Sequence, residues 1–139
     1  MNFFLTFYHT LRFWIVIIIL SIVLGTIATI LGIFDKSGNQ SHQVAALWSK
    51  LICRWNGIKV EIAGAENILL DQPQIFIANH QGYYDIFALA GYLGVQLRWV
   101  SKSALFRIPF MGWAMSAAGY IPVKRANRKQ SYQAFLSTL

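Results

Sequence analysis

The chain has 139 residues, of which 56% are hydrophobic and 12% charged, and its formal net charge is +7. Average soluble domains carry about 25% charged residues, so this composition argues against an ordinary soluble domain and favours a membrane segment or a membrane-facing surface. One cysteine, Cys53, excludes an intrachain disulfide and a cysteine-based metal site, and three histidines far apart in sequence leave a metal site unsupported.

The positive charge is concentrated in the C-terminal part. Residues 1–97 hold five basic and five acidic residues, whereas residues 98–139 hold seven basic residues and no acidic one. A cationic region favours an anionic partner, which could be phosphate, a phospholipid headgroup or nucleic acid. Nucleic acid is the least favoured, because the chain begins with a hydrophobic segment and contains no helix-turn-helix, zinc-finger or RNA-binding signature.

The first predicted element is an apolar helix. The 22 residues from Phe13 to Phe34 carry no charge, and about 20 suffice to cross a hydrocarbon core. A cleaved signal peptide is disfavoured, because its apolar part is usually about 7–15 residues long. Arg12 precedes the run and four basic residues follow it before residue 60, which orients the C-terminal part towards the cytoplasm. A re-entrant or interfacial helix is also compatible. We therefore predict an anchor at residues 1–40 and a domain at residues 41–139.

An amphipathic helix is predicted next, after a polar turn at residues 35–40. It begins near Ser41 and ends at Asn56-Gly57. Its apolar face consists of Val44, Leu47, Trp48, Leu51, Ile52 and Trp55. Two interpretations stay open at this point, a helix lying in the membrane interface and an ordinary core-facing helix.

Strands and helices alternate over the rest of the chain. The expected strands are 58–62, 75–78, 97–100 and 120–123, the second being of the fully buried type. The expected helices are 85–92, 104–106, 111–118 and a last one that begins at residue 126 or 127. This alternation favours an α/β fold with a largely parallel sheet.

The candidate catalytic residues are His80 and Asp85, in the sequence Asn79-His80-Gln81-Gly82-Tyr83-Tyr84-Asp85 between a strand and a helix. A neutral imidazole accepts a proton near pH 7, and a carboxylate that holds its other nitrogen fixes the tautomer. The alternatives are a helix N-cap for Asp85, an ordinary loop residue for His80 and a turn-former for Asn79. Because no serine or cysteine nucleophile has a recognisable setting, His80 as a base would activate a substrate hydroxyl.

Two cations are candidates for binding an anionic group. Lys102 stands at a strand end, and Pro109 and Gly112 shape a tight link further on. The last strand delivers Arg125 at its C-terminal end, the usual ligand edge of a parallel sheet, and a guanidinium binds phosphate through paired hydrogen bonds. The alternative for both cations is a solvated or lipid-facing charge.

Taken in order, these elements resemble the 1-acylglycerol-3-phosphate acyltransferase family. Residues 79–85 match its Asn-His-x4-Asp motif, residues 102–112 are similar to its next conserved stretch, and residues 121–125 are similar to the motif that ends in a phosphate-binding arginine. Two features depart from the family. Lys124 stands where it usually has aspartate, and its Glu-Gly-Thr-Arg motif is missing. Since the chain stops at Leu139 inside a helical pattern, we expect a C-terminally truncated fragment.

The resemblance implies a mostly parallel sheet flanked by helices and an enzyme of phospholipid biosynthesis. The reaction would move an acyl group from acyl-CoA or acyl carrier protein to the 2-hydroxyl of lysophosphatidic acid, giving phosphatidic acid. His80 would be the base and Asp85 would hold it, and the substrate-binding residues would be Asn79, Lys102, Gly112 and Arg125. No metal or bound cofactor is implied, membrane phospholipid would be a partner, and the location would be the bacterial inner membrane, facing the cytoplasm. The alternatives are another lysolipid acceptor, a hydrolase, and a non-catalytic phospholipid-binding fragment.

Overall fold

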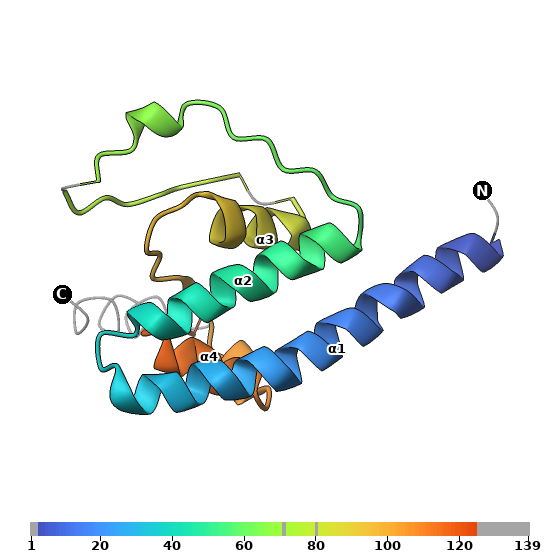
Figure 1. Cartoon of the computed structure of the whole chain (residues 1–139), viewed down its shortest axis with the longest axis horizontal. Coiled ribbons are helices and arrows are strands. Elements are labelled where there is room, and N and C mark those ends of the chain that lie inside the picture. The colour runs from blue at the N-terminus through green and yellow to red at the C-terminus, as the bar shows by residue number, and fades with distance from the viewer. Residues whose placement is uncertain (1–2, 71, 80, 125–139) are drawn as a thin grey trace.

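The computed structural model describes residues 3–70, 72–79 and 81–124 (Figure 1). His80, Arg125 and the helix expected from residue 126 or 127 lie outside the described residues. The described parts form four α-helices, two short 3-10 helices and a small parallel sheet. The predicted combination of helices with a parallel sheet is therefore confirmed at this level.

The N-terminal helix α1 spans Phe3–Phe34, so it begins ten residues before the charge-free run. It is long and apolar enough to cross a membrane, by length and composition. Figure 1 shows that α2 and α4 lie against its C-terminal part, whereas its N-terminal part extends beyond the other helices. The domain boundary near residue 40 stays a prediction.

Small residues allow α1 to approach its neighbours closely. A Cβ on Gly32 would lie 2.6 Å from the Cβ of Ala117 in α4, so no larger residue fits without a shift. Ser41 at the start of α2 donates a 2.8 Å hydrogen bond from Oγ to the carbonyl of Ala28. These contacts pack α2 and α4 against the C-terminal part of the apolar run.

The second helix, α2, spans Asn39–Trp55 and lies between α1 and α3 (Figure 1). The Asp35 carboxylate accepts hydrogen bonds from the backbone N–H of Gln40 at 2.8 Å and of Ser37 at 3.0 Å, which satisfies donors at the start of the helix. Ile52 and Cys53 of α2 are fully buried and form the core with Phe87 of α3. The core-facing interpretation therefore holds for Trp48 and Ile52, whereas Leu47 and Trp55 of the predicted face are exposed.

Helix α3, Tyr83–Tyr92, contributes Phe87 to the core, where its ring meets Trp48 at 5.2 Å between centroids. Strands β1, Val100–Lys102, and β2, Ile121–Val123, pair in parallel, with Lys102 opposite Val123. Two short helices connect these strands, η2 at Leu105–Arg107 and α4 at Met111–Ala117. The predicted break near Pro109 is thus observed, and the predicted helix 104–106 is a 3-10 turn.

Two predicted strands are wrong. Residues 58–62 are not a strand, although Ile58 and Val60 still pack against the core, and the turn after them contains η1 at Ala65–Asn67. Residues 75–78 were expected to be buried, but Ile75 is 82% and Ile77 93% exposed. A buried parallel strand needs a hydrogen-bonded neighbour and a helix on each face. Within the described residues the sheet has two strands and reaches neither segment.

Candidate active site

Asp85 lies in the first turn of α3 and organises the turn before it. Its Oδ2 accepts hydrogen bonds from the backbone N–H of Gln81 at 2.7 Å and of Gly82 at 2.9 Å. The Gly82 N–H is a donor that the helix start leaves unpaired, the Gln81 N–H lies one residue before it, and the positive end of the helix dipole favours the carboxylate there. The N-cap residue is Gly82, so the predicted N-cap position of Asp85 is wrong, but from the N3 position its carboxylate reaches back to cap the helix start.

The cap leaves the catalytic interpretation possible. A carboxylate has two oxygens with about four acceptor positions, so a helix cap and a histidine partner are compatible in one side chain. By holding the N–H of Gln81, the carboxylate fixes the residue next to position 80. The roles of His80 and Asn79 stay predictions, since His80 lies outside the described residues and Asn79 is exposed in the loop before the helix.

The predicted catalytic turn lies beside the apolar helix. Tyr84, next to Asp85, places its ring 5.6 Å from that of Phe13 in α1 and 6.0 Å from that of Phe87. Phe13 is the first residue of the charge-free run of α1. The start of α3 is thus fixed next to the segment of the chain that is best suited to contact lipid.

Lys102 lies at the C-terminal end of β1, where it is exposed. Its partner in the parallel register is Val123, whose carbonyl accepts a 3.0 Å hydrogen bond from the backbone N–H of Ser103. Lys124 follows directly and is exposed too, and Arg125 comes next in the sequence, beyond the described residues. The structure therefore brings Lys102 to the same sheet edge as the end of β2. This edge is built on different elements from the Asp85 turn.

Gly112 is buried in the first turn of α4. A Cβ at this position would lie 2.2 Å from the carbonyl oxygen of Phe106, so any side chain would separate α4 from η2. Packing alone accounts for glycine here. Substrate binding by Gly112 stays a prediction.

The sequence did not indicate a polar network around the buried side chain of His42. The Nδ1 of His42 lies 2.8 Å from the hydroxyl of Tyr120, and its Nε2 lies 3.3 Å from the backbone nitrogen of Leu97. Arg98 donates to Asn39 Oδ1 at 2.9 Å and to the carbonyl of Ser37. The partners of His42 are 55 and 78 residues away, so no local spacing indicates them. The network joins the α1–α2 turn to the N-terminal ends of both strands.

Burial sets the ionisation of this network. It lowers the pKa of His42, an effect that the nearby Arg98 charge reinforces and the Val95 carbonyl opposes. Burial also raises the pKa of Tyr120, so both side chains are neutral near pH 7.

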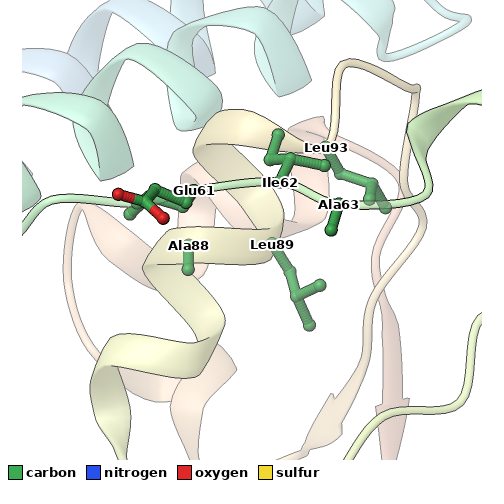
Figure 2. Close-up of a pocket in the computed structure, with 7 residues that line it drawn as sticks. Glu61, Ile62, Ala63, Ala88, Leu89 and Leu93 are labelled. Carbon is green, nitrogen blue, oxygen red and sulfur yellow. The ribbon is translucent and has the colours of Figure 1, made fainter.

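An open apolar pocket of about 260 Å³ lies between α3 and the extended segment before η1 (Figure 2). Its lining consists of Val60, Glu61, Ile62, Ala63, Ala88, Leu89 and Leu93. Ala88 is one helical turn after Asp85, so this apolar surface begins close to the predicted catalytic turn. In the part of the chain that the structure describes, no group of three or more His, Cys, Asp or Glu residues could hold a metal ion.

Comparisons with known proteins agree with the motifs. A family model described as Acyltransferase matches residues 59–139. The chain is 38% identical over 95 residues to the 1-acyl-sn-glycerol-3-phosphate acyltransferase LPAT1, chloroplastic, of Arabidopsis thaliana, covering 67% of this chain and 26% of that protein. It is 35% identical over 100 residues to a Chlamydomonas reinhardtii protein of the same enzyme name, covering 69% and 29%.

A bacterial relative matches over more of its length. The 1-acyl-sn-glycerol-3-phosphate acyltransferase of Haemophilus influenzae is 33% identical over 129 residues, covering 88% of this chain and 50% of that protein. The chain thus spans about a quarter of the length of the plant relative and half of the bacterial one. No solved structure matches the chain.

Proposed function

The chain belongs to the acyltransferase family, and from this we propose that the protein carrying it transfers an acyl group to the 2-hydroxyl of 1-acylglycerol-3-phosphate. The acyl donor would be a thioester of coenzyme A or acyl carrier protein, and the product phosphatidic acid. The names of the relatives support the acceptor. The observation that carries the proposal is the Asn79–Asp85 turn, which the Asp85 carboxylate holds at the start of α3 beside α1.

In the proposed reaction, the imidazole of His80 takes the proton of the 2-hydroxyl while Asp85 stabilises the imidazolium. The alkoxide oxygen attacks the thioester carbonyl carbon. The tetrahedral intermediate then collapses with cleavage of the carbon–sulfur bond, and the departing thiolate takes the proton from His80. This route requires no enzyme nucleophile and no bound cofactor beyond the thioester co-substrate.

Phosphate binding is assigned to the cationic edge of the sheet. Lys102 and Arg125 would neutralise the phosphate of the acceptor, with Asn79 and Gly112 as further substrate-binding residues. Parallel pairing of β1 with β2 supports this assignment, because it places Lys102 opposite Val123, two residues before Arg125. Arginine suits phosphate through two parallel hydrogen bonds.

Membrane attachment is assigned to α1, in line with its hydropathy. Contacts of Ala28 and Gly32 with α2 and α4 cover part of the helix, while the side that faces outward carries exposed isoleucines. We propose that this outward side lies in the bilayer at the cytoplasmic face of a bacterial inner membrane. The acceptor, itself a membrane lipid, would then reach the turn at Asp85 without leaving the lipid phase.

His80→Ala tests the reaction. Because it removes the proposed base, we expect turnover of lysophosphatidate with an acyl thioester in vesicles to fall at least 100-fold, the low end for general-base catalysis of about 10²–10⁴. Membrane attachment should persist, since α1 is unchanged. The matched control is His9→Ala, which changes an exposed histidine near the start of α1 and should keep its activity.

Product analysis distinguishes the alternatives. Release of free fatty acid in place of phosphatidic acid would identify a hydrolase. If the unaltered protein binds vesicles but shows no turnover, the result would support the non-catalytic phospholipid-binding alternative. Near-normal turnover of the His80→Ala protein would contradict the mechanism.

A further inference from the structure

A strained turn at Ile108–Phe110 connects η2 to α4, within a partly exposed stretch that is named the Arg107–Trp113 turn. Phe110 has φ 61° and ψ −56°, and the N–H of Met111 donates a 2.7 Å hydrogen bond to the carbonyl of Pro109. These are the features of a γ-turn of the rare, strained kind. Strain of this type persists only where the surroundings hold it, and it is found preferentially at functional positions.

The strained turn presents apolar side chains to solvent. Ile108 is 44% and Trp113 52% exposed, and the Trp113 ring lies 5.1 Å from that of Phe110. The N–H of Gly112 bonds the carbonyl of Ile108 at 2.7 Å, so the backbone on both sides of Phe110 is tied. The turn therefore holds two large apolar side chains outward on a short, internally bonded segment.

This turn is packed onto the middle of α1. A Cβ on Gly25 would lie 2.9 Å from the carbonyl oxygen of Phe110, so the two backbones are in close contact. Ile22, three residues before Gly25, and Ile18, four residues earlier still, lie along the same side of the helix and are exposed. The exposed apolar side of α1 thus continues onto the turn.

The chain that forms this surface carries basic residues. Arg107 begins the turn and is exposed, and Lys102 and Lys124 are exposed at the sheet edge that follows β1 and β2. No acidic residue occurs in the chain after Asp85. An apolar surface with tryptophan and a cationic rim matches the interface of a bilayer that contains anionic lipids.

We propose that the Arg107–Trp113 turn is a second membrane-docking element, which places Ile108 and Trp113 at the boundary of headgroups and acyl chains beside α1. Arg107 then faces the anionic headgroups. The turn begins five residues after the last residue of β1, so its docking fixes the height of Lys102 above the lipid surface. If the turn instead bound a protein partner, it would remain exposed to solvent when the protein is bound to vesicles of pure lipid.

The experiment measures the depth of single positions. In a Cys53→Ala background, which removes the chain's only cysteine, Trp113→Cys carries an environment-sensitive fluorophore. Ile22→Cys is the reference for α1, and Glu66→Cys, on exposed η1, is the control for a surface away from lipid. The vesicles are phosphatidylcholine with phosphatidylglycerol and a spin-labelled lipid as quencher.

We expect the fluorescence emission of the label at position 113 to shift to the blue and to be quenched by the spin-labelled lipid, as at position 22. The emission of the label at position 66 should show neither change. A label at position 113 that behaves like that at position 66, in protein that sediments with the vesicles, would overturn the proposal. It would leave α1 as the membrane contact and a protein as the partner of the turn.

A second pair of variants avoids labelling. Trp113→Ala should lower partition onto the same vesicles about fivefold to tenfold, as expected when a large apolar group is withdrawn from the interface. Trp55→Ala, which removes a comparably exposed tryptophan from the end of α2, should leave partition unchanged. Equal partition of the two variants would contradict docking by the turn.

Discussion

At the scale of single residues, Asp85 combines two roles that substitutions can separate. Its Oδ2 caps α3, and the proposed mechanism gives the same carboxylate the task of holding His80. Asparagine can accept the capping hydrogen bonds but carries no charge to stabilise an imidazolium. Alanine can do neither.

Asp85→Asn should therefore lose activity with little loss of stability. We expect turnover in vesicles to fall by about 10²–10⁴, the range of general acid–base catalysis, while the free energy of unfolding changes by less than about 0.5 kcal/mol. Asp85→Ala should lose the same activity and also about 1 kcal/mol of stability, measured by urea unfolding. An asparagine variant that keeps normal turnover would reduce Asp85 to a helix cap.

At the scale of elements, local patterns predicted what local interactions determine. Helices α1, α2 and α3 follow from apolar runs and turn residues, and the strands near residues 100 and 121 were placed within three residues. Whether a segment joins a sheet depends on a partner strand that is far away in the sequence. Local patterns therefore predicted strands at the apolar runs 58–62 and 75–78, which the structure does not form. The same limit hid His42, whose partners come from the loop before β1 and from the start of β2.

The buried histidine makes the contact between α2 and the strands depend on pH. Burial lowers the pKa of His42 in the folded protein, whereas the unfolded chain titrates near 6.5. Below that value the unfolded state binds more protons, so stability is lost as the pH falls through about 6.5 towards the folded pKa. The groups that face His42 are the Tyr120 hydroxyl, the backbone of Val95 and Leu97, and the Arg98 charge. Of these, only the Val95 carbonyl favours the charged imidazolium. The others oppose it or do not compensate its charge.

His42→Gln tests this assignment. We expect the unaltered protein to lose stability between pH 7 and pH 5 in urea unfolding, and the glutamine variant to show a flatter profile because the titrating group is gone. His9→Gln, at an exposed position, should keep the profile of the parent. If the pH dependence of stability is the same for all three proteins, a group other than His42 causes the loss of stability at low pH.

At the scale of the whole molecule, apolar and cationic surfaces occur together. The chain has a net charge of +7, and its last acidic residue, Asp85, precedes the sheet edge and the Arg107–Trp113 turn. The sequence shows this asymmetry directly, and from it we predicted an anionic partner. The structure adds that Phe110 seats the turn against Gly25 of α1, a contact between residues 85 positions apart that no sequence pattern indicates.

Electrostatic attraction should therefore add to apolar binding in a way that salt reveals. Each basic side chain near an anionic surface contributes about 1 kcal/mol, and the contribution decays within a Debye length of roughly 8 Å at physiological ionic strength. We expect partition onto vesicles with phosphatidylglycerol to weaken as salt rises, and partition onto pure phosphatidylcholine to change little.

Replacing Lys102 and Arg107 together by glutamine should flatten the salt dependence on anionic vesicles. The same change at Arg54 and Lys59, two exposed cations before residue 60, should preserve it, because only the first pair borders the docking surface. Equal effects of the two pairs would mean that net charge, and not the position of the cations, governs the attraction.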